Sequence, residues 1–396
     1  MPENNFRVNG TGPVGIYLTT ATTAANRMTG TSTTYYPLGT CETYPLLDEE
    51  NSLTPVFNDM YGDSPYTYMH SGMMGTIQFV LNRFTWANLL KLINSDPQQS
   101  LETEAVTGTQ QLNRAGILGA RGTAAEGSNH AFGLYLHYGW SNDSNYSGRL
   151  PGAIVGRRYH SVSLAGLQII SAGTRQLAAT ITLKPSLALN SDGNVEMYRN
   201  LTSIPSSLNI TDFVCQDIAT TGAIGVYGSV DNGSNYVAIG HCERFPIITY
   251  TRNLQPISCD LFGDVPFDYQ FMGEQTTIEM DFNRFNASNL NTVLNASFHA
   301  SRGVLTQSKI GAKVDEQGST LKLWFPSSER PSTANALVFN RGHFMRATPT
   351  SMGSRQYKEG VIWANAGVPD CSGTTGNLQR WDLVTDNSAA LSDFTS

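Results

Sequence analysis

The chain has 396 residues and a formal net charge of −7, and only 14% of its residues are charged, well below the roughly 25% of typical soluble domains. This balance excludes a strongly basic nucleic-acid-binding protein, and 40% hydrophobic residues are enough for two ordinary cores. A surface so poor in charge is usually covered, which favours assembly into a larger structure. No apolar run approaches the roughly 18 residues of a membrane span, and the N-terminus lacks a signal-peptide pattern. We therefore expect assembly in a cytoplasm, without a membrane anchor.

In the first half, the Thr-rich run from Thr19 to Tyr36 is expected to be an enlarged loop. The stretch Thr76–Asn82 alternates apolar and polar residues, which is typical of a strand with one buried face. Thr85 can then begin a short helix whose apolar side contains Leu89. Further strand-like stretches follow at residues 131–138, 161–170 and 178–183.

The second half repeats this order. Thr277–Asn283 alternates in the same way, and Asn286 can cap a helix that places Leu290 and Leu294 on one side. Strand-like stretches follow at residues 319–324 and 360–363. A helix of about ten residues cannot stand alone and must lie on a sheet. The predicted fold is therefore mainly β: two tandem copies of an antiparallel β-sandwich domain, each with one short α-helix and long loops.

An internal repeat supports the two-copy prediction. The stretch Gly39–Ser95 recurs without a gap as Gly240–Ala296, an offset of 201 positions. Upstream, Thr11–Tyr17 matches Thr221–Tyr227 at an offset of 210, and downstream matches follow at offsets of 187, 183 and 180. The changes in offset place insertions and deletions in loops. A period near 200 residues has the length of a whole domain, so the sequence indicates a fused duplication.

The repeat also sets the expected boundaries. We predict a first domain at residues 1–189, a polar linker at 190–207 and a second domain at 208–371. The remaining residues, 372–396, are rich in Ser, Thr, Asp and Gly, and we expect a flexible C-terminal extension.

Residues that recur in both copies are candidates for the contacts that both domains make. Cys41 and Cys242 are expected to be small buried hydrophobes, and Asp63 and Asp264 to be turn residues. The repeat-equivalent residues that we single out as structural candidates are Cys41, Glu42, Asp63, Arg83, Phe84, Asn88 and Leu89, with Cys242, Glu243, Asp264, Arg284, Phe285, Asn289 and Leu290. We expect these residues to serve structure, with Phe84 and Phe285 buried where the helix meets the sheet.

The sequence offers no pattern for catalysis or for a cofactor. The five cysteines form no CxxC or Cys/His ligand spacing, and the seven histidines show no ligand spacing either. The run from Gly10 to Gly15 matches GxGxxG, but Pro13 removes an N–H that would face a phosphate, and the second copy has Thr220 at the first glycine. We therefore expect neither an enzyme nor a bound metal or cofactor.

The segments Asn82–Leu89 and Asn283–Leu290 carry a resemblance. An alternating strand that ends in a polar residue, Phe, three residues and Asn-Leu resembles the tail tube proteins of long-tailed bacteriophages. Family members often have acidic residues ahead of the Phe, where this chain has Arg83 and Arg284, and many have a single domain. The similarity covers about 40 residues in each half.

The resemblance implies a structural virion protein. Subunits of that family join their sheets into rings, and the rings stack into a tube that conducts DNA. A chain with two such domains would build a six-domain ring from three copies. Implied partners are further copies of the chain, the tape-measure protein and other tail proteins, and the implied location is the virion tail. With net charges of −2 for residues 1–200 and −5 for residues 201–396, we expect a neutral to acidic lumen through which DNA passes without specific binding.

Other classes remain open at this point. A trimeric hub or distal tail protein would show the same duplication. A double-domain major capsid protein would also be duplicated and trimeric, but the same short helix closes both repeated windows here. A carbohydrate-binding tail-tip protein would explain the aromatic content, with 17 Tyr and 5 Trp, but would not need two domains matched without a gap.

Overall fold

A computed structural model gives the fold of the chain. The residues that it describes are 14–19, 35–41, 45–84, 86, 89, 103–106, 109–112, 131–138, 152–160, 164–172, 176–184, 195–198, 224–230, 234–242, 244–258, 260, 266–286, 288–290, 293, 319–325, 336–353, 356–365, 381–384, 386 and 389–394.

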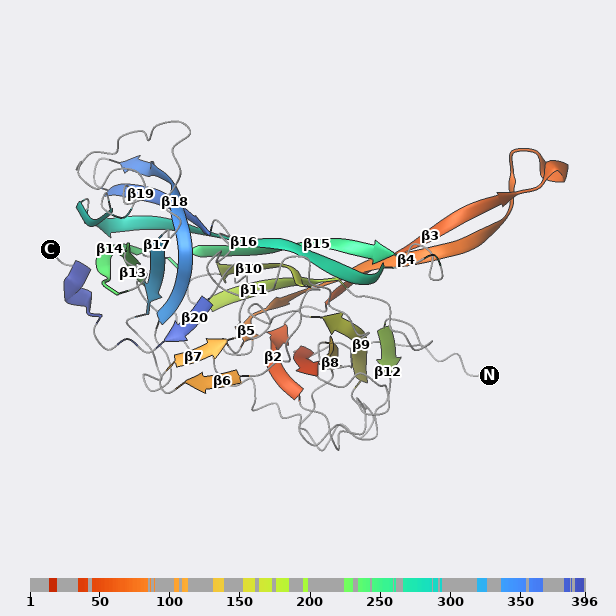
Figure 1. Cartoon of the computed structure of the whole chain (residues 1–396), viewed down its shortest axis with the longest axis horizontal. Coiled ribbons are helices and arrows are strands. Elements are labelled where there is room, and N and C mark those ends of the chain that lie inside the picture. The colour runs from red at the N-terminus through yellow and green to blue at the C-terminus, as the bar shows by residue number, and fades with distance from the viewer. Residues whose placement is uncertain are drawn as a thin grey trace, which may run out of the picture.

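The architecture is mainly β, as the alternating sequence patterns predicted, and the strands pair in antiparallel fashion (Figure 1). The strands are β1 (Val14–Thr19), β2 (Tyr35–Cys41), β3 (Leu46–Phe57), β4 (Pro65–Leu81), β5 (Arg83–Phe84), β6 (Thr103–Val106), β7 (Thr109–Leu112), β8 (Ala131–Tyr138), β9 (Gly152–His160), β10 (Leu164–Ala172), β11 (Gln176–Leu183), β12 (Val195–Tyr198), β13 (Ile224–Ser229), β14 (Val237–Cys242), β15 (Ile247–Ser258), β16 (Pro266–Phe285), β17 (Ser319–Trp324), β18 (Ala336–Gly353), β19 (Gln356–Asn365) and β20 (Trp381–Val384). Two short 3₁₀ helices, η1 (Asp59–Tyr61) and η6 (Leu391–Phe394), are also described.

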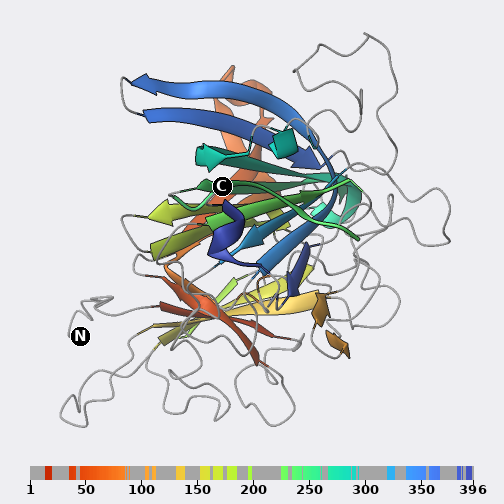
Figure 2. The same ribbon diagram turned by 90° about the vertical axis from the view of Figure 1, so that its left-hand side faces the viewer.

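A six-stranded sheet is built from the first half of the chain, in the order β12-β9-β8-β1-β2-β5. In Figure 2 it forms a layer below the larger sheet. β12 lies inside the stretch that the sequence predicted as a linker, and it pairs with β9 from Val195 to Tyr198. Its alternation of Val195 and Met197 with polar Glu196 is too short to stand out in a polar stretch.

The larger sheet runs through both halves of the chain. β16 holds it together because different parts of this strand of 20 residues pair with β15, β19 and β14. One path through it, which we call the long sheet, follows β3, β4, β11, β10, β15, β16, β19 and residues 346–353 of β18. A second path continues from β14 through β13, β17 and the start of β18 to β20, β7 and β6.

Strand register recurs at the offsets found in the sequence. β4 pairs Ile77 with Leu183 of β11, and β16 pairs Ile278 with Trp363 of β19, positions 201 and 180 residues further on. Irregularities recur as well: the register shift between Ser52 and Leu53 matches the one between Asn253 and Leu254. Likewise, the shift between Leu164 and Gly166 in β10 matches the one between Phe344 and Arg346 in β18. The duplication stays an inference from the sequence, and these registers support it.

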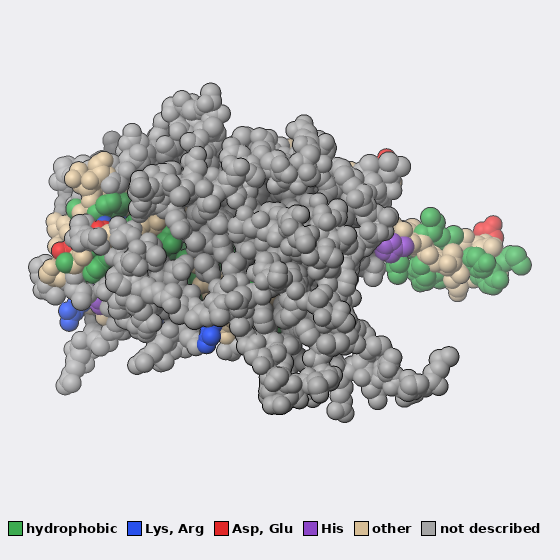
Figure 3. Space-filling model, turned by 90° about the horizontal axis from the view of Figure 1, so that it is seen from below, with side chains coloured by type: hydrophobic (Ala, Val, Ile, Leu, Met, Phe, Trp, Pro, Cys, Tyr) green, Lys and Arg blue, Asp and Glu red, His purple; other side chains and the backbone are tan. Residues whose placement is uncertain are grey.

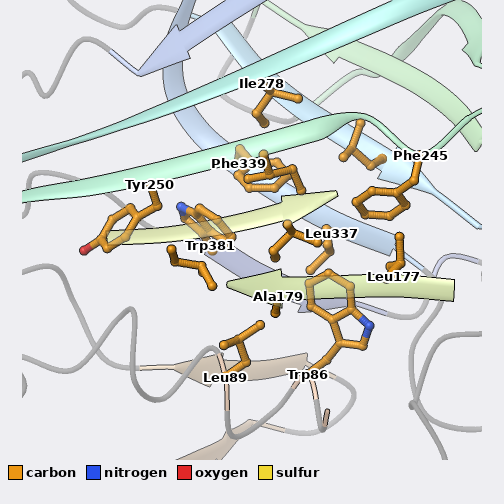
Figure 4. Close-up of a cluster of buried hydrophobic side chains, with 14 of the residues drawn as sticks. Trp86, Leu89, Leu177, Ala179, Phe245, Tyr250, Ile278, Leu337, Phe339 and Trp381 are labelled. Carbon is orange, nitrogen blue, oxygen red and sulfur yellow. The ribbon is translucent and has the colours of Figure 1, made fainter. Parts of the chain in front are cut away.

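Among the described residues, the largest core is shared by both halves instead of being divided into the two cores that composition suggested. Buried side chains from both halves form this large cluster, which Figure 4 shows in part, and Tyr227, Trp324 and Ala336 form a smaller one. Trp86 of the first half lies 6.4 Å from the ring of Phe245 of the second half, and Phe245 stacks on Phe325 at 5.9 Å. Burial of such aromatic rings contributes about 1.5 to 3 kcal/mol each. The two halves therefore stabilise each other.

The predicted helix after β16 begins as expected. The Asn286 side chain accepts a hydrogen bond from the backbone N–H of Asn289 at 3.1 Å, and the Leu290 N–H donates to the Asn286 carbonyl at 2.9 Å. These are the capping and first-turn bonds of an α-helix. Residues 288–290 and 293 are helical, as are Trp86 and Leu89 after β5.

The expectation of a flexible C-terminal extension is wrong for the part of it that the structure describes, residues 381–384, 386 and 389–394. Trp381–Val384 forms β20, which pairs with β18, and the Trp381 side chain is fully buried. Beyond it, Asp393 of η6 accepts a hydrogen bond from the Tyr227 hydroxyl at 2.8 Å, and Phe394 packs edge-on against the Tyr227 ring. A few large aromatic residues fix this segment although its composition is polar.

Candidate assembly surfaces

The two repeated cysteines are buried, as predicted. Cys41 and Cys242 are 0% and 1% exposed and belong to the core cluster. Burial raises the pKa of Cys41 to about 12 and also raises the pKa of Cys242. Since the thiolate is the reactive form of cysteine, these side chains behave as small hydrophobes.

The repeated apolar residues are buried to different degrees. Phe84, Leu89 and Leu290 belong to the core, and Phe84 meets Trp86 edge-on at 5.1 Å. Phe285 is only partly buried, so the expectation that both phenylalanines are buried is confirmed for Phe84 and wrong for Phe285. The Asn289 amide donates to the Ala238 carbonyl of β14 at 2.8 Å. This bond attaches the helix to the sheet, a role that the sequence pattern did not specify.

The repeated charged residues that the structure describes lie at the surface. Arg83 and Arg284 are exposed, and Asp63 is exposed in the turn between β3 and β4, beside Gly62 with a positive φ of 60°. The turn prediction for Asp63 is confirmed. The remaining candidates, Glu42, Asn88, Glu243 and Asp264, lie outside the described residues.

A junction between β10 and β15 joins the two halves of the chain. Gly166 pairs with Thr251 and Ile169 with Ile248, in antiparallel register. β15 belongs to the second half, so its backbone completes the edge of a four-stranded sheet from the first half. Backbone pairing of this kind joins two separate sheets into one.

Both ends of the long sheet remain edges. Within the described residues, β3 pairs with β4, and residues 346–353 of β18 pair with β19, and no strand pairs on their other sides. Unpaired edges are templates for pairing with another chain. β3 corresponds to β15 by the sequence offset, and this part of β18 corresponds to β10. The two edges are therefore the counterparts of the two strands that meet at the internal junction.

One face of the long sheet is polar. Cross-strand register aligns Val80, Thr180, Gln168, Thr249 and Thr277 in one row, and these side chains are exposed or half-buried. The adjacent positions point into the core. Charged residues exposed on this polar face include Asp48, Glu50, Glu279 and Asp281. The exposed charged side chains named here are all acidic, and Arg346 of β18 aligns with Ile362 and Glu279 in a row of the same face.

A buried ionic network lies next to the junction, on the core side of β15 and β16. The Arg252 Nε donates to the Tyr250 hydroxyl at 2.6 Å and to Glu274 Oε2 at 3.3 Å, and Tyr250 also donates to Glu274. The side chains of Arg252 and Glu274 are 0% and 1% exposed. Burial raises the pKa of Glu274, and the neighbouring Arg252 opposes that rise. The counterparts in the first half are Glu49, Asn51 and Met73, so sequence comparison of the copies could have identified the network as special to the second.

The β3–β4 hairpin projects beyond the rest of the molecule (Figures 1 and 3). We call its outer part, residues 52–71 with η1 at the tip, the arm. Large hydrophobic side chains of the arm are exposed: Leu53 54%, Phe57 57%, Met60 84%, Tyr61 56%, Tyr66 62%, Tyr68 58% and Met69 63%. Sequence reasoning identified the turn but missed the arm, although its aromatic and Met residues at exposed hairpin positions were a signal.

The described residues show no group of three or more His, Cys, Asp or Glu side chains placed to hold a metal ion. Among those residues there is also no helix long and apolar enough to span a membrane. The features that remain as candidate functional surfaces are the two sheet edges, the polar face and the arm. Comparison with protein-family models and with curated proteins found no match to this chain.

Proposed function

We propose that the chain is a structural subunit that assembles through its sheet edges into trimeric rings of pseudo-sixfold symmetry. These rings stack into the tail tube of a bacteriophage and guide DNA. The observation that carries this proposal is the β10–β15 junction. It joins two sheets that the sequence repeat relates to each other, and within the described residues it leaves the corresponding edges, β3 and residues 346–353 of β18, unpaired at the two ends.

The internal junction predicts the register of the external one. Moving the pair Gly166 and Thr251 by the offsets of 180 and 201 gives Arg346 of one copy opposite Glu50 of the next. The next pair places Ala347 opposite Glu49. An arginine directly across from a glutamate stabilises an antiparallel pair by about 0.2 to 1 kcal/mol.

This interface is heterologous, because two different edges meet. A heterologous contact closes into a ring when its rotation allows and otherwise gives an open filament. In the proposed ring, the contact between chains has the same rotation as the internal junction, so three chains give six equivalent steps. With eight strands of the long sheet from each chain, at a spacing of about 4.8 Å and a tilt of about 40°, three chains enclose a circle about 50 Å across.

The polar face of the long sheet lines the inside in this arrangement. Its exposed Thr and Gln side chains and its carboxylates at Asp48, Glu50, Glu279 and Asp281 offer duplex DNA few cations. Each phosphate neutralised by Lys or Arg would hold the duplex in place and make binding depend on salt. A face that lacks this attraction suits passage, and the other tail components, including a tape-measure protein, would occupy or cap the same tube.

A charge exchange tests the ring and its register together. Arg346→Glu should place two carboxylates opposite each other and weaken assembly, and Glu50→Arg in the same chain should restore it. The measurements are native mass spectrometry and end-on cryo-electron microscopy of the assemblies. Trimers with six similar lobes are expected. Hexamers of whole chains, or equal loss of assembly in the single and double variants, would contradict the proposal.

Passage of DNA is tested separately on the assembled protein. A gel-shift titration of duplex DNA at low salt should show no tight complex, because the exposed charged side chains named on the polar face are all acidic. Tight binding that weakens steeply with salt would exclude a passive conduit while leaving the ring intact.

A further inference from the structure

The arm exposes a group of large apolar side chains. Its large side chains are more than half exposed, and the Tyr61 and Tyr66 rings stack on each other at 5.7 Å at the tip. At its base, the Ser71 hydroxyl donates to the Ser52 carbonyl at 3.0 Å, which adds to the backbone pairing of β3 with β4. A contiguous apolar surface of this kind marks an interaction site.

The second half of the chain contains a hairpin of the same register, and part of that hairpin is buried. β15 and β16 repeat the register of β3 and β4, including both of its irregularities. Leu254 and Tyr269 of this hairpin are 7% and 5% exposed. Their counterparts in the arm, Leu53 and Tyr68, are 54% and 58% exposed. Equivalent positions on hairpins of equal register thus differ mainly in what covers them.

The position of the partly buried hairpin identifies the occupant. β15 pairs with β10 of the first half at the internal junction. The outer part of β15 extends beyond this pairing in the direction in which the arm projects (Figure 1). The arm continues β3 in the same way, and β3 is the edge proposed to meet β18 of the next copy. The arm therefore begins where a neighbouring second half would lie.

The composition of the arm agrees with a protein partner. Residues 52–71 contain no Lys or Arg and two Asp residues, so the arm lacks the basic groups that bind anionic lipid or nucleic acid. Tyr and Met are enriched in the centres of protein interfaces, and Met adapts to the surface that it meets.

We propose that the arm docks on the second half, residues 208–371, of another copy of this chain, as the β15–β16 hairpin docks within its own chain. This inference rests on the proposed ring, since the ring brings that half next to β3. The arm thereby extends the sheet-edge contact by a second, apolar contact.

Photo-cross-linking tests the partner and its location. Tyr66 is replaced by p-benzoylphenylalanine, and ¹⁴N- and ¹⁵N-labelled chains are mixed before assembly. The expected product is a covalent dimer in which a peptide from residues 208–371 of one isotope is joined to the arm of the other. Cross-links only within one chain, or only to residues 1–207 of another copy, would overturn the inference.

A variant with polar residues in the arm tests how much the arm contributes to assembly. The triple variant Met60→Ser, Tyr66→Ser and Met69→Ser should keep the melting temperature of the monomer, because these side chains are exposed. Its apparent dissociation constant for assembly should rise at least tenfold. The matched control is Val230→Ser, which removes an apolar side chain 42% exposed outside the arm and should leave assembly unchanged. Normal assembly of the triple variant would refute the docking of the arm but not the proposed ring. Failure of the wild-type chain to form rings would refute the proposed function.

Discussion

Replacing Arg252 with Met should destabilise the protein strongly and make its stability depend on pH. Arg252 is the cation beside Glu274, with Nε 3.3 Å from Oε2, and both side chains are essentially inaccessible to water. Removing one partner of a buried pair leaves an uncompensated charge and costs about 3 to 5 kcal/mol. The expected loss in the free energy of unfolding at pH 8 is in this range.

The direction of the pH effect follows from Glu274. Its pKa is already raised by burial, and loss of Arg252, which opposes that rise, should raise it further. A carboxyl group with a raised pKa in the folded state destabilises the fold fully above that pKa, and this penalty disappears below the unfolded value of about 4.3. The stability difference between Arg252→Met and the wild type should therefore shrink as the pH falls from 8 towards 4.5.

Urea denaturation, followed by tryptophan fluorescence at several pH values, measures this difference. The matched control is the triple variant Tyr250→Phe, Arg252→Met, Glu274→Met, which replaces the network by apolar side chains and follows the first half in placing Met at the glutamate position. It should recover most of the lost stability, because apolar substitutes for a buried ion pair are often neutral. A loss below about 1 kcal/mol for Arg252→Met, independent of pH, would refute the reasoning.

Three further predictions concern packing, and thermal or urea unfolding measures each of them. Phe84→Ala should lower the free energy of unfolding by about 3 to 5 kcal/mol, because Phe84 is 2% exposed. Phe285→Ala should lower it by at most about half as much. Equal losses in the two variants would contradict the difference in burial. Gly39→Ala should cost about 1 to 3 kcal/mol, because a Cβ there would lie 2.2 Å from the Arg83 carbonyl oxygen; Gly166→Ala, where the nearest atom is 3.6 Å away, is its control and should have little effect. Trp381→Ala should cost about 3 to 5 kcal/mol, and wild-type stability would show that the C-terminal segment does not contribute to the core.

Local pattern was sufficient for the fold class and for several elements. Alternation predicted strands within β4 and β16, since each has one face in the core, and strand-like composition predicted β8, β11 and β17. Asn286 was identified as a cap because its short side chain reaches the N–H groups of the first turn. The repeat predicted burial of both cysteines from a single recurring position.

Features that depend on distant contacts were not predictable in this way. β20 is held by Trp381, whose Nε1 donates to Thr276 at 3.3 Å across 105 positions of sequence, and no local pattern encodes that contact. The shared core arises because Trp86 and Phe245 come from different halves. Sequence periodicity also could not show that the two hairpins differ in exposure, since exposure depends on what lies over them.

The β10–β15 junction has a consequence for the kinetics and evolution of assembly. Because one peptide chain connects its two sides, this contact forms within a single molecule and does not depend on the concentration of the protein. Every folded chain therefore already contains one sheet junction, and only its outer edges have to pair with a second molecule. Covalent linkage also frees the two kinds of joint to diverge: Tyr250, Arg252 and Glu274 lie beside the inner one, while Glu49, Asn51 and Met73 hold the corresponding positions by the outer edge. Separate single-domain subunits, which must use one sequence at every contact, could not make that distinction.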